Sequence, residues 1–309
     1  MDGILYRWRS NRIVGKESQE PEEIYKLNTF NEIKQYCEQN NKQIYDYVYE
    51  TEGEEIKNFL GEIWEAMKES ICFGLNAEGI IPGKLQLSKR AKSIYNNKIE
   101  NEPTEVKRTR LLTAYAYAVS ETNASGGEIV TAPTCGSCGV LPATLYYLQK
   151  EDKYTDEEII NALATAGIIG NIVKTNASIS GAECGCQAEI GTACSMAAAA
   201  CSQLRKLDIY KIEHAAEIAM EHHLGLTCDP IYGYVQIPCI ERNAVAAIRA
   251  IDASNISMLL DENQKISFDL ITETMYETGK DLRSHYRETS TGGLAKKYCR
   301  NKYYNTDME

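Results

Sequence analysis

Residues 176–186 read NASISGAECGC, residues 226–230 read LTCDP, and residues 236–239 read QIPC. Between the first two segments lie residues 191–204 and 209–224, which we predict to be helices. The whole stretch combines cysteines in turn-forming segments with small hydroxylated residues and a pair of adjacent histidines. We interpret it as a site in which a metal centre and a small polar substrate meet, and as the centre around which the rest of the chain folds.

The sequence on either side of this stretch is patterned for helices. Apolar residues recur at three- and four-residue steps, most clearly from Ile56 to Ile71. Thr155 and Glu158 have the spacing of a capping box, which starts a helix. Strand signals are scarce, although residues 121–139 form a loop in which we expect a short extended piece. We therefore predict a mainly α fold, with helices over residues 22–40 (weakly), 54–78, 103–120, 140–149, 159–173, 191–204, 209–224, 237–252 and 268–286.

The length of 309 residues suits one large domain or two ordinary ones, and 43% hydrophobic residues can fill a sizeable core. Residues 1–21 are polar and charged, so we expect a loose arm there. We predict that residues 1–60 form this arm and a weakly helical segment. Residues 61–309 are expected to form one compact, all-helical domain, because small alanine-rich segments let helices approach closely.

Charge and hydropathy exclude several classes of protein. A net charge of -11 argues against nucleic-acid binding, which favours a basic surface. No apolar run approaches the 18 residues of a membrane-spanning helix. The first nine residues, MDGILYRWR, lack the apolar core of a secretory signal. We expect a cytoplasmic protein.

Eleven cysteines need an explanation, because stable disulfides are uncommon in a reducing compartment. The candidates for metal ligation are Cys186, Cys228 and Cys239, which lie at helix edges or in turns beside glycine or proline. Backbone N–H groups in such segments can bond to cluster sulfurs. The long spacing does not match the short runs of ferredoxins or zinc ribbons. From spacing alone, buried thiols in a helical core are the better explanation.

The other cysteines fit packing better than ligation. We expect Cys194 and Cys201 to share one buried face of a helix, and Cys72 to lie in the core. Cys184 is separated from Cys186 by one residue, which makes joint ligation of one metal awkward. A C-x-x-C pair at positions 135 and 138 indicates zinc or redox chemistry, but no second pair completes a zinc site.

Polar side chains in the loops could bind a carboxylate or a small zwitterion. Helix capping and turn formation explain them equally well. The candidates for substrate binding are Ser125, Thr134, Asn176, Ser178 and Ser180.

Two further candidates follow the second predicted helix of the central stretch. His222 or His223 could act as a general base, whereas a histidine at a helix end more often stabilises the helix dipole. Arg242 could pair with a substrate carboxylate or form an ordinary salt bridge.

Several long segments resemble the iron–sulfur L-serine dehydratases, also called L-serine ammonia-lyases. The resemblance extends from about Trp64 to Cys299 and is to the α subunit or catalytic domain of that family. The segments that carry it are SGG at 125–127, TAPT at 131–134, residues 176–187, MEHHLGLTCDP at 220–230, VQIPCIERNA at 235–244, MYETGKD at 275–281 and YRETS at 286–290.

The resemblance implies an all-helical catalytic domain that holds a 4Fe–4S cluster through Cys186, Cys228 and Cys239. The remaining iron is then open to substrate and acts as a Lewis acid on the β-hydroxyl of L-serine. The products are pyruvate and ammonia, without pyridoxal phosphate. The family motif carries a histidine at His222, so we predict that this residue, rather than His223, is the catalytic base.

The chain also departs from the family pattern. Cys135 stands where the family often has asparagine, and ten residues follow Cys299, which roughly corresponds to a C-terminal cysteine that blocks the open iron in some members. The regulatory β domain has no counterpart in the first sixty residues, so we expect a separate β subunit and leave open a homo- or hetero-oligomer.

Two other functions remain open. One is a related lyase that acts on L-threonine or L-cysteine. The other is a non-catalytic cluster protein that senses iron or oxygen or assembles a complex. The hydroxylated loops around the cysteines speak against the second, because a sensor has no need of them.

Overall fold

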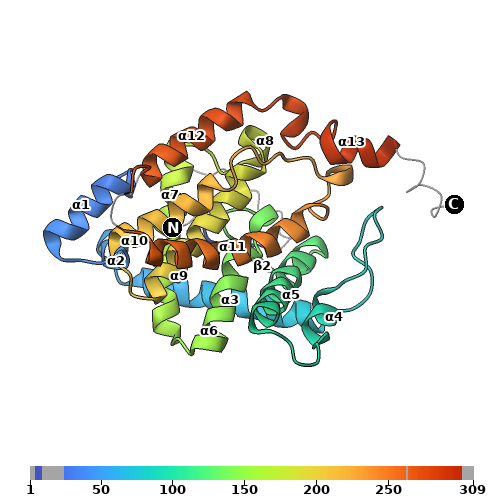
Figure 1. Cartoon of the computed structure of the whole chain (residues 1–309), viewed down its shortest axis with the longest axis horizontal. Coiled ribbons are helices and arrows are strands. Elements are labelled where there is room, and N and C mark those ends of the chain that lie inside the picture. The colour runs from blue at the N-terminus through green and yellow to red at the C-terminus, as the bar shows by residue number, and fades with distance from the viewer. Residues whose placement is uncertain (1–3, 9–23, 262–263, 301–309) are drawn as a thin grey trace.

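A single helix, α9 (Thr192–Leu204), forms the centre of the molecule (Figure 1). All of its residues are buried, and it packs against α6, α7, α10 and α11. Its sequence is largely Ala, Ser and Cys, and these small side chains allow neighbours to approach from every side. The computed structural model describes residues 4–8, 24–261 and 264–300, and in these it has the helices α1 (Phe30–Asn40), α2 (Ile44–Glu52), α3 (Glu55–Asn76), α4 (Ala91–Asn96), α5 (Thr104–Ala124), α6 (Val140–Asp152), α7 (Asp156–Asn176), α8 (Gly181–Cys184), α9, α10 (Ile209–Glu221), α11 (Cys239–Leu259), α12 (Phe268–Asp281) and α13 (Gly293–Arg300).

Shorter elements connect these helices. The two strands β1 (Tyr6–Trp8) and β2 (Ile129–Thr131) pair antiparallel, with Arg7 opposite Val130. Single 3-10 turns form η1 (Cys135–Ser137), η3 (Ile231–Gly233) and η4 (Ser284–Tyr286). A π-helical segment, η2 (Gln187–Gly191), leads directly into α9.

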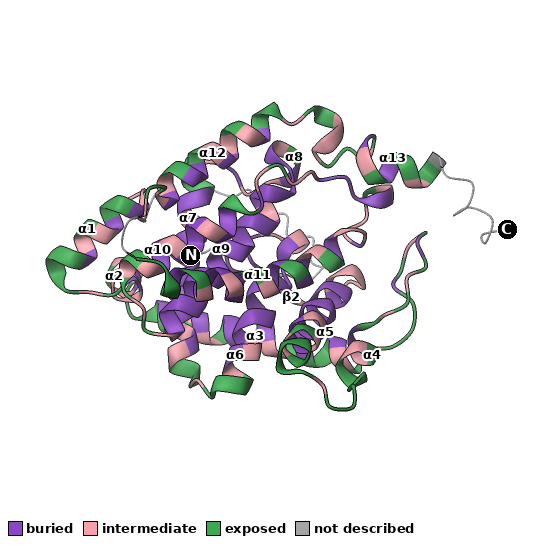
Figure 2. Cartoon of the chain, viewed as in Figure 1, coloured by how far each residue is buried: buried purple, intermediate pink, exposed green. Residues whose placement is uncertain are grey.

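A second group of helices, α3, α4 and α5, packs beside this centre, where α5 contacts both α11 and α6. The contact between α3 and α5 is close at Gly74, where a Cβ would lie 2.2 Å from the carbonyl oxygen of Ala118. Only glycine fits there without moving a helix. Figure 2 shows the buried residues concentrated in α7, α9 and α11, with exposed residues on the outer faces of α1, α4 and α12.

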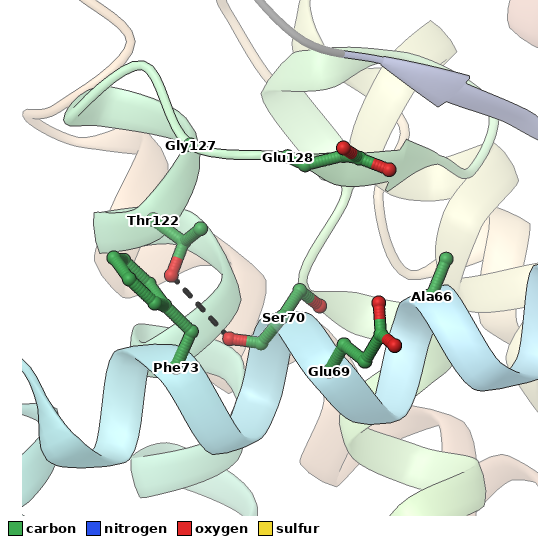
Figure 3. Close-up of a pocket in the computed structure, with 7 residues that line it drawn as sticks. All are labelled: Ala66, Glu69, Ser70, Phe73, Thr122, Gly127 and Glu128. Atoms are coloured by element: carbon green, nitrogen blue, oxygen red, sulfur yellow. Dashed lines mark hydrogen bonds between the residues drawn. The ribbon is translucent and has the colours of Figure 1, made fainter.

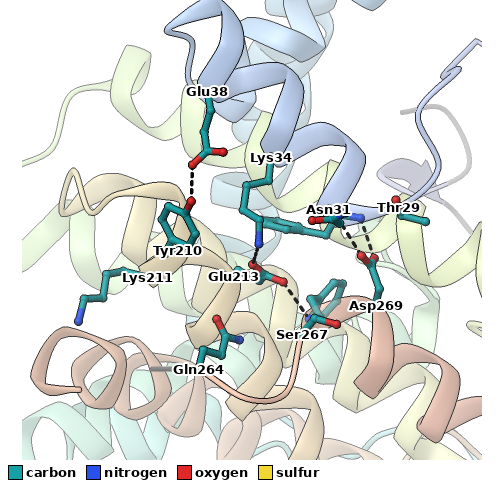
Figure 4. Close-up of polar contacts among 12 residues, drawn as sticks. Thr29, Asn31, Lys34, Glu38, Tyr210, Lys211, Glu213, Gln264, Ser267 and Asp269 are labelled. Atoms are coloured by element: carbon teal, nitrogen blue, oxygen red, sulfur yellow. Dashed lines mark hydrogen bonds and ion pairs between the residues drawn. The ribbon is translucent and has the colours of Figure 1, made fainter. Parts of the chain in front are cut away.

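The N-terminal helices are attached through polar contacts among α1, α10 and α12 (Figure 4). Asp269 accepts hydrogen bonds from the N–H groups of Phe30 and Asn31 at 2.7 and 3.0 Å, so α12 caps the start of α1. Glu213 of α10 accepts one from the N–H of Phe268 at 3.2 Å and pairs with Lys34 at 2.6 Å. The three helices are therefore joined in series, because α12 caps α1, α10 caps α12, and the Lys34–Glu213 ion pair links α1 to α10.

The structure confirms the mainly α fold class. The capping box of Thr155 and Glu158 is present at the start of α7, and β2 is the short extended piece expected within residues 121–139. The prediction for Cys72 was wrong: this residue is exposed, although its neighbour Ile71 is fully buried. Adjacent residues of a helix point about 100° apart, so residue 72 turns away from the core.

The predicted arm over residues 1–21 lies mostly outside the described residues. Residues 4 and 5 are buried, and Phe30, Ile44 and Val48 join the same hydrophobic core as the later helices. A domain boundary at residue 60 stays a prediction. Among the described residues, none of the helices is long and apolar enough to cross a membrane.

Candidate metal centre

The three predicted cysteine ligands come from separate segments, and two of them, Cys186 and Cys228, lie close together before the start of α9. Cys186 lies between α8 and η2, Cys228 lies in the loop after α10, and Cys239 is the first residue of α11. All three are buried. The Sγ atoms of Cys186 and Cys228 and a carboxylate oxygen of Glu189 all lie within 4.8 Å of one another.

The hydrogen bond between Cys186 and Cys228 dominates the protonation of both thiols. This bond lowers the pKa of Cys186 and raises the pKa of Cys228. The positive charge of Arg242 also lowers the pKa of Cys186, because it stabilises the thiolate. Burial raises the pKa of Cys239, and the negative charge of Cys186 raises it further. The three thiols therefore resist joint ionisation in the protein alone. A cationic metal centre would remove that conflict, so this set of sulfur donors fits an iron–sulfur cluster.

Backbone contacts hold the Cys186 segment against the loop that carries Cys228. The N–H of Gln187 donates to the carbonyl of Leu226 at 3.2 Å, and the N–H of Gly225 donates to Oε1 of Gln187 at 2.8 Å. Gly185 has a φ of 75°, and a Cβ there would lie 2.8 Å from the Leu226 carbonyl oxygen. Glycine at this position therefore allows the two segments to meet.

Cys184 packs against α12. Its Cβ lies 2.5 Å from the point that a Cβ on Gly279 of α12 would occupy. Cys194 and Cys201 are fully buried within α9, and burial raises the pKa of each. These positions agree with packing rather than ligation for the three residues.

The loop that carries Thr134 contacts Glu189. Thr134 Oγ1 donates to Oε1 of Glu189 at 2.8 Å. Asn243 of α11 fixes this loop, because its Oδ1 accepts from the N–H of Gly139 and its Nδ2 donates to the carbonyls of Gly136 and Cys239, each at 2.8 Å. The structure thus brings Thr134 into the site, and it adds Asn243 as a residue that positions both the loop and Cys239.

Arg242 lies beside the ligands, but its guanidinium already has protein partners. Nη1 donates to the carbonyl of Thr227 at 2.6 Å, and Nη2 lies 3.9 Å from Oδ1 of Asp229. Its charge lowers the pKa of Cys186. A bond from Arg242 to a substrate carboxylate stays a prediction.

The described contacts of the remaining predicted substrate residues do not include the predicted ligands. Asn176 donates to the carbonyls of Asn28 and Ile172, so its described contacts are structural. Ser178 accepts from the N–H of Ser180 at 3.1 Å. Ser125 ends α5, and its buried Oγ has no hydrogen-bond partner among the described residues. Their substrate-binding roles stay predictions.

Ser180 lines an open cavity of about 410 Å³, together with Glu183, Arg287 and Thr289. The cavity is next to the metal site, because the N–H of Cys228 donates to the carbonyl of Tyr286 and the N–H of Glu288 donates to the carbonyl of Cys228. Arg287 Nε is buried without a described partner. Hydroxyls and a guanidinium suit a carboxylate, and we did not predict Arg287 from the sequence.

The two adjacent histidines have different surroundings. His222 is the C-cap of α10 and is exposed, whereas His223 is buried, with Nδ1 2.6 Å from the carbonyl oxygen of Ala219. Burial lowers the pKa of His223. The described contacts do not join His222 to the three cysteines, so its role as a base stays a prediction.

Glu189 was not among the predicted site residues. It is partly buried in η2, and burial raises the pKa of its carboxyl to about 7. A signal for it was available, because Glu189 is the only charged residue between Glu183 and Arg205. Short π-helical segments often occur at functional sites, but nothing in the local pattern indicated one here.

A second cavity, of about 300 Å³, lies between α3 and the end of α5 (Figure 3). Phe73, Thr122 and Glu128 line it, and Thr122 Oγ1 contacts the carbonyl oxygen of Ser70 at 3.4 Å. None of the residues that line it is a predicted site residue.

Comparison with known proteins identifies the family. The model of the serine dehydratase alpha chain matches residues 17–295. L-serine dehydratase from Haemophilus influenzae is 44% identical over 295 residues, which cover 92% of this chain and 64% of the relative. L-serine dehydratase TdcG from Escherichia coli is 45% identical over 282 residues, 88% of this chain and 62% of the relative. L-serine dehydratase from Streptomyces coelicolor is 46% identical over 243 residues, 78% of this chain and 53% of the relative.

The chain thus spans less than two thirds of the length of these three relatives. The family match covers the three predicted ligands, the Thr134 loop and Glu189. The match extends over most of the chain, and the chain therefore belongs to the serine dehydratase alpha chain family.

Proposed function

We propose that this chain is the catalytic part of an iron–sulfur L-serine dehydratase, which converts L-serine to pyruvate and ammonia. The observation that carries the proposal is the approach of Cys186 and Cys228, from two segments, to within 4.8 Å of each other and of Glu189. Cys239, from a third segment, lies close enough to Cys186 for the charge of that residue to raise its pKa. Family membership supports the substrate, since the relatives are named L-serine dehydratases.

Cys186, Cys228 and Cys239 would hold a 4Fe–4S cluster. Such a cluster, held by three thiolates, supplies one iron with an open position, which is a Lewis acid for the β-hydroxyl. The thiol donors and the glycines in the adjoining loops suit this cofactor.

The residues of this chain would bind and orient the amino acid. We assign substrate contacts to Ser125, Thr134, Asn176, Ser178, Ser180 and Arg242, of which Thr134 has the strongest support, because its hydroxyl bonds to Glu189 beside the cysteines.

The reaction needs one proton acceptor and one leaving group. The α-proton would pass to the imidazole of His222, and the β-hydroxide would leave. Elimination gives aminoacrylate and water, the aminoacrylate tautomerises to an imine, and hydrolysis of the imine consumes one water. The sum is therefore L-serine to pyruvate and ammonia.

Anaerobic purification tests the proposal. We expect iron, sulfide and a cluster absorption band in the purified protein, together with pyruvate formation from L-serine. L-threonine and L-cysteine should be assayed in parallel, because a larger rate with either would change the substrate. A loaded cluster without turnover of any of the three amino acids would favour a non-catalytic role.

We also propose a β subunit or domain as partner. The support is the family description, which names an alpha chain, and the greater length of the relatives. Co-purification with a second chain, or a rise in turnover when one is added, would test it. Cytoplasmic location likewise remains a prediction.

A further inference from the structure

Glu189 is the acidic side chain that lies among the candidate ligands. Its carboxylate lies close to two glycines. A Cβ on Gly136 would lie 3.1 Å from Oε2 of Glu189, and a Cβ on Gly181 would lie 2.8 Å from the same atom. The added Cβ on Gly181 would also lie 3.1 Å from Cys228 Sγ. The carboxylate therefore occupies a space between η1 and α8 that exists because both of these positions are glycine.

The two carboxylate oxygens of Glu189 have different surroundings. Oε1 accepts the hydrogen bond from Thr134 Oγ1 at 2.8 Å, which orients the group. Both oxygens lie close to Gly136, but Oε2 is the one that faces Gly181, and it has no hydrogen-bond donor among the described residues. One oxygen is thus anchored, and the other can accept a bond from a molecule that enters the site.

The neighbouring acids are engaged or exposed. Asp229 accepts bonds from Thr227 Oγ1 and the N–H of Leu294. Glu183 pairs with Lys280 at 2.5 Å. Glu288 is exposed. Among these described carboxylates, Glu189 is the one that faces the cysteines with an oxygen open to a ligand.

We propose that Glu189 binds the α-ammonium group of the amino-acid substrate. This inference rests on the proposed function, because an amino acid is the substrate class that it requires. An ammonium group brings three N–H donors and a positive charge, and a partly buried carboxylate binds such a group more strongly than a neutral acceptor does. Glu189 would therefore select amino acids over the corresponding hydroxy acids.

L-alanine and L-lactate test this directly, because L-alanine carries an ammonium group on the α-carbon where L-lactate carries a hydroxyl. Neither has the β-hydroxyl that is lost in the proposed reaction. Their dissociation constants are measured by calorimetry on the cluster-loaded chain, for the unmodified protein and for Glu189→Gln. We expect L-alanine to bind roughly ten- to a hundredfold more weakly to the variant. The affinity for L-lactate should change less than about threefold on the same reasoning.

Glu217→Gln is the matched control. Glu217 is a glutamate that is more buried than Glu189, and it lies on α10 beside Glu213 and Glu221. This variant should leave both affinities unchanged. Equal weakening of L-alanine and L-lactate in Glu189→Gln, or no weakening of either, would overturn the proposal. If Glu189→Gln does not retain the cluster, Glu189→Asp takes its place, because it shortens the side chain and withdraws the carboxylate from the substrate; weaker binding confined to L-alanine is again required.

The outcome is separable from that of the deamination itself. Pyruvate formation from L-serine is measured on the unmodified protein in the same preparation. Selective loss of L-alanine binding without any pyruvate formation would refute the proposed reaction and leave the ammonium site standing. Pyruvate formation with unchanged L-alanine binding in Glu189→Gln would refute the ammonium site alone.

Discussion

Cys186, Cys228 and Cys239 can be tested one residue at a time. Replacing any of them by serine should abolish the cluster absorbance, because a cluster held by three thiolates loses one of its anchors. Iron content and the visible spectrum of anaerobically purified protein are the measurements.

Cys194→Ser and Cys201→Ser provide the control, since both residues are buried in α9 and lie outside the candidate ligand set. These variants should keep the cluster. Full cluster content in a variant of one of the three predicted ligands would remove that residue from the site.

His222 and His223 differ enough in burial to be compared directly. If His222 is the base, His222→Gln should retain the cluster and lose exchange of the serine α-proton with solvent. His223→Gln should instead affect packing, because His223 is buried against Gly191. Proton exchange at the normal rate in His222→Gln would place the base elsewhere.

Glu189 and the three cysteines illustrate what sequence can and cannot predict at this scale. The cysteines were selected by the family resemblance, since their spacing alone favoured simple packing. Glu189 was missed because a single glutamate has no pattern of its own. Its importance comes from Thr134, Gly136 and Gly181, which are brought to it only by folding.

The contacts among α1, α10 and α12 make a prediction at the scale of elements (Figure 4). Glu213→Ala removes the pairing with Lys34 and the cap on Phe268, from a side chain that is 1% exposed. We expect the free energy of unfolding to fall by about 1.5–3 kcal/mol, the range for lost hydrogen bonds to a charged group. Urea unfolding followed by circular dichroism, at equal iron content, measures it.

Glu78→Ala is the control for this prediction. Glu78 pairs with Lys92, but both side chains are well exposed. Exposed pairs contribute little, so no measurable change in stability is expected. A similar small effect in Glu213→Ala would show that the caps do not stabilise the assembly of the three helices.

Elements with their own local signals were predictable. The helix α7 was marked by its capping box, and α3 by its apolar spacing. The segment from α8 to η2 was not, because Gly181 and Gly185 permit many conformations and the contacts that select one come from Leu226 and Met275, far along the chain.

Glu217 makes a prediction about the stability of the whole molecule. Burial, followed by the charge of Glu221, raises the pKa of Glu217 to about 8, and His214 Nε2 lies 3.9 Å away. The folded protein then holds a proton that the unfolded chain has released, so stability falls as the pH rises from about 4.5 to about 8. Glu217→Gln should remove that part of the decline and stabilise the fold at pH 7.5 by roughly 1–3 kcal/mol.

Unfolding midpoints at pH 5.5 and pH 7.5 measure this difference. Burial also lowers the pKa of His214, so a His214→Gln variant separates the two residues. The same pH dependence in the unmodified protein and in Glu217→Gln would contradict the assignment to Glu217.

Cluster loss should affect activity and stability together. An iron with an open position is exposed to oxidants, so air should abolish turnover, and iron with a reductant should restore part of it. A cluster held by the three predicted ligands would tie α8, the loop after α10 and α11 together, so the cluster-free protein should also melt at a lower temperature. Undiminished activity after prolonged aeration would indicate a different cofactor.

At this scale the sequence predicted the fold class and most of the long helices, because their apolar periodicity is repeated over many residues. The site was less predictable because it is assembled from segments far apart in the chain. Arg287 forms a backbone bridge with Cys228, and Asn243 donates a hydrogen bond to Gly136 in the Thr134 loop. Both contacts depend on packing of the complete helical core.

The π-helical segment η2 is equivalent to a one-residue insertion at the start of α9. One residue turns an α-helix by about 100°, so Cys186 points in a different direction from the one that an uninterrupted helix would give it. The residues of α9 that follow η2 keep the directions of a regular α-helix, and all of them are buried. Deletion of one residue within η2, such as Ala188, should therefore misdirect the predicted ligand Cys186 while leaving the core sequence of α9 intact.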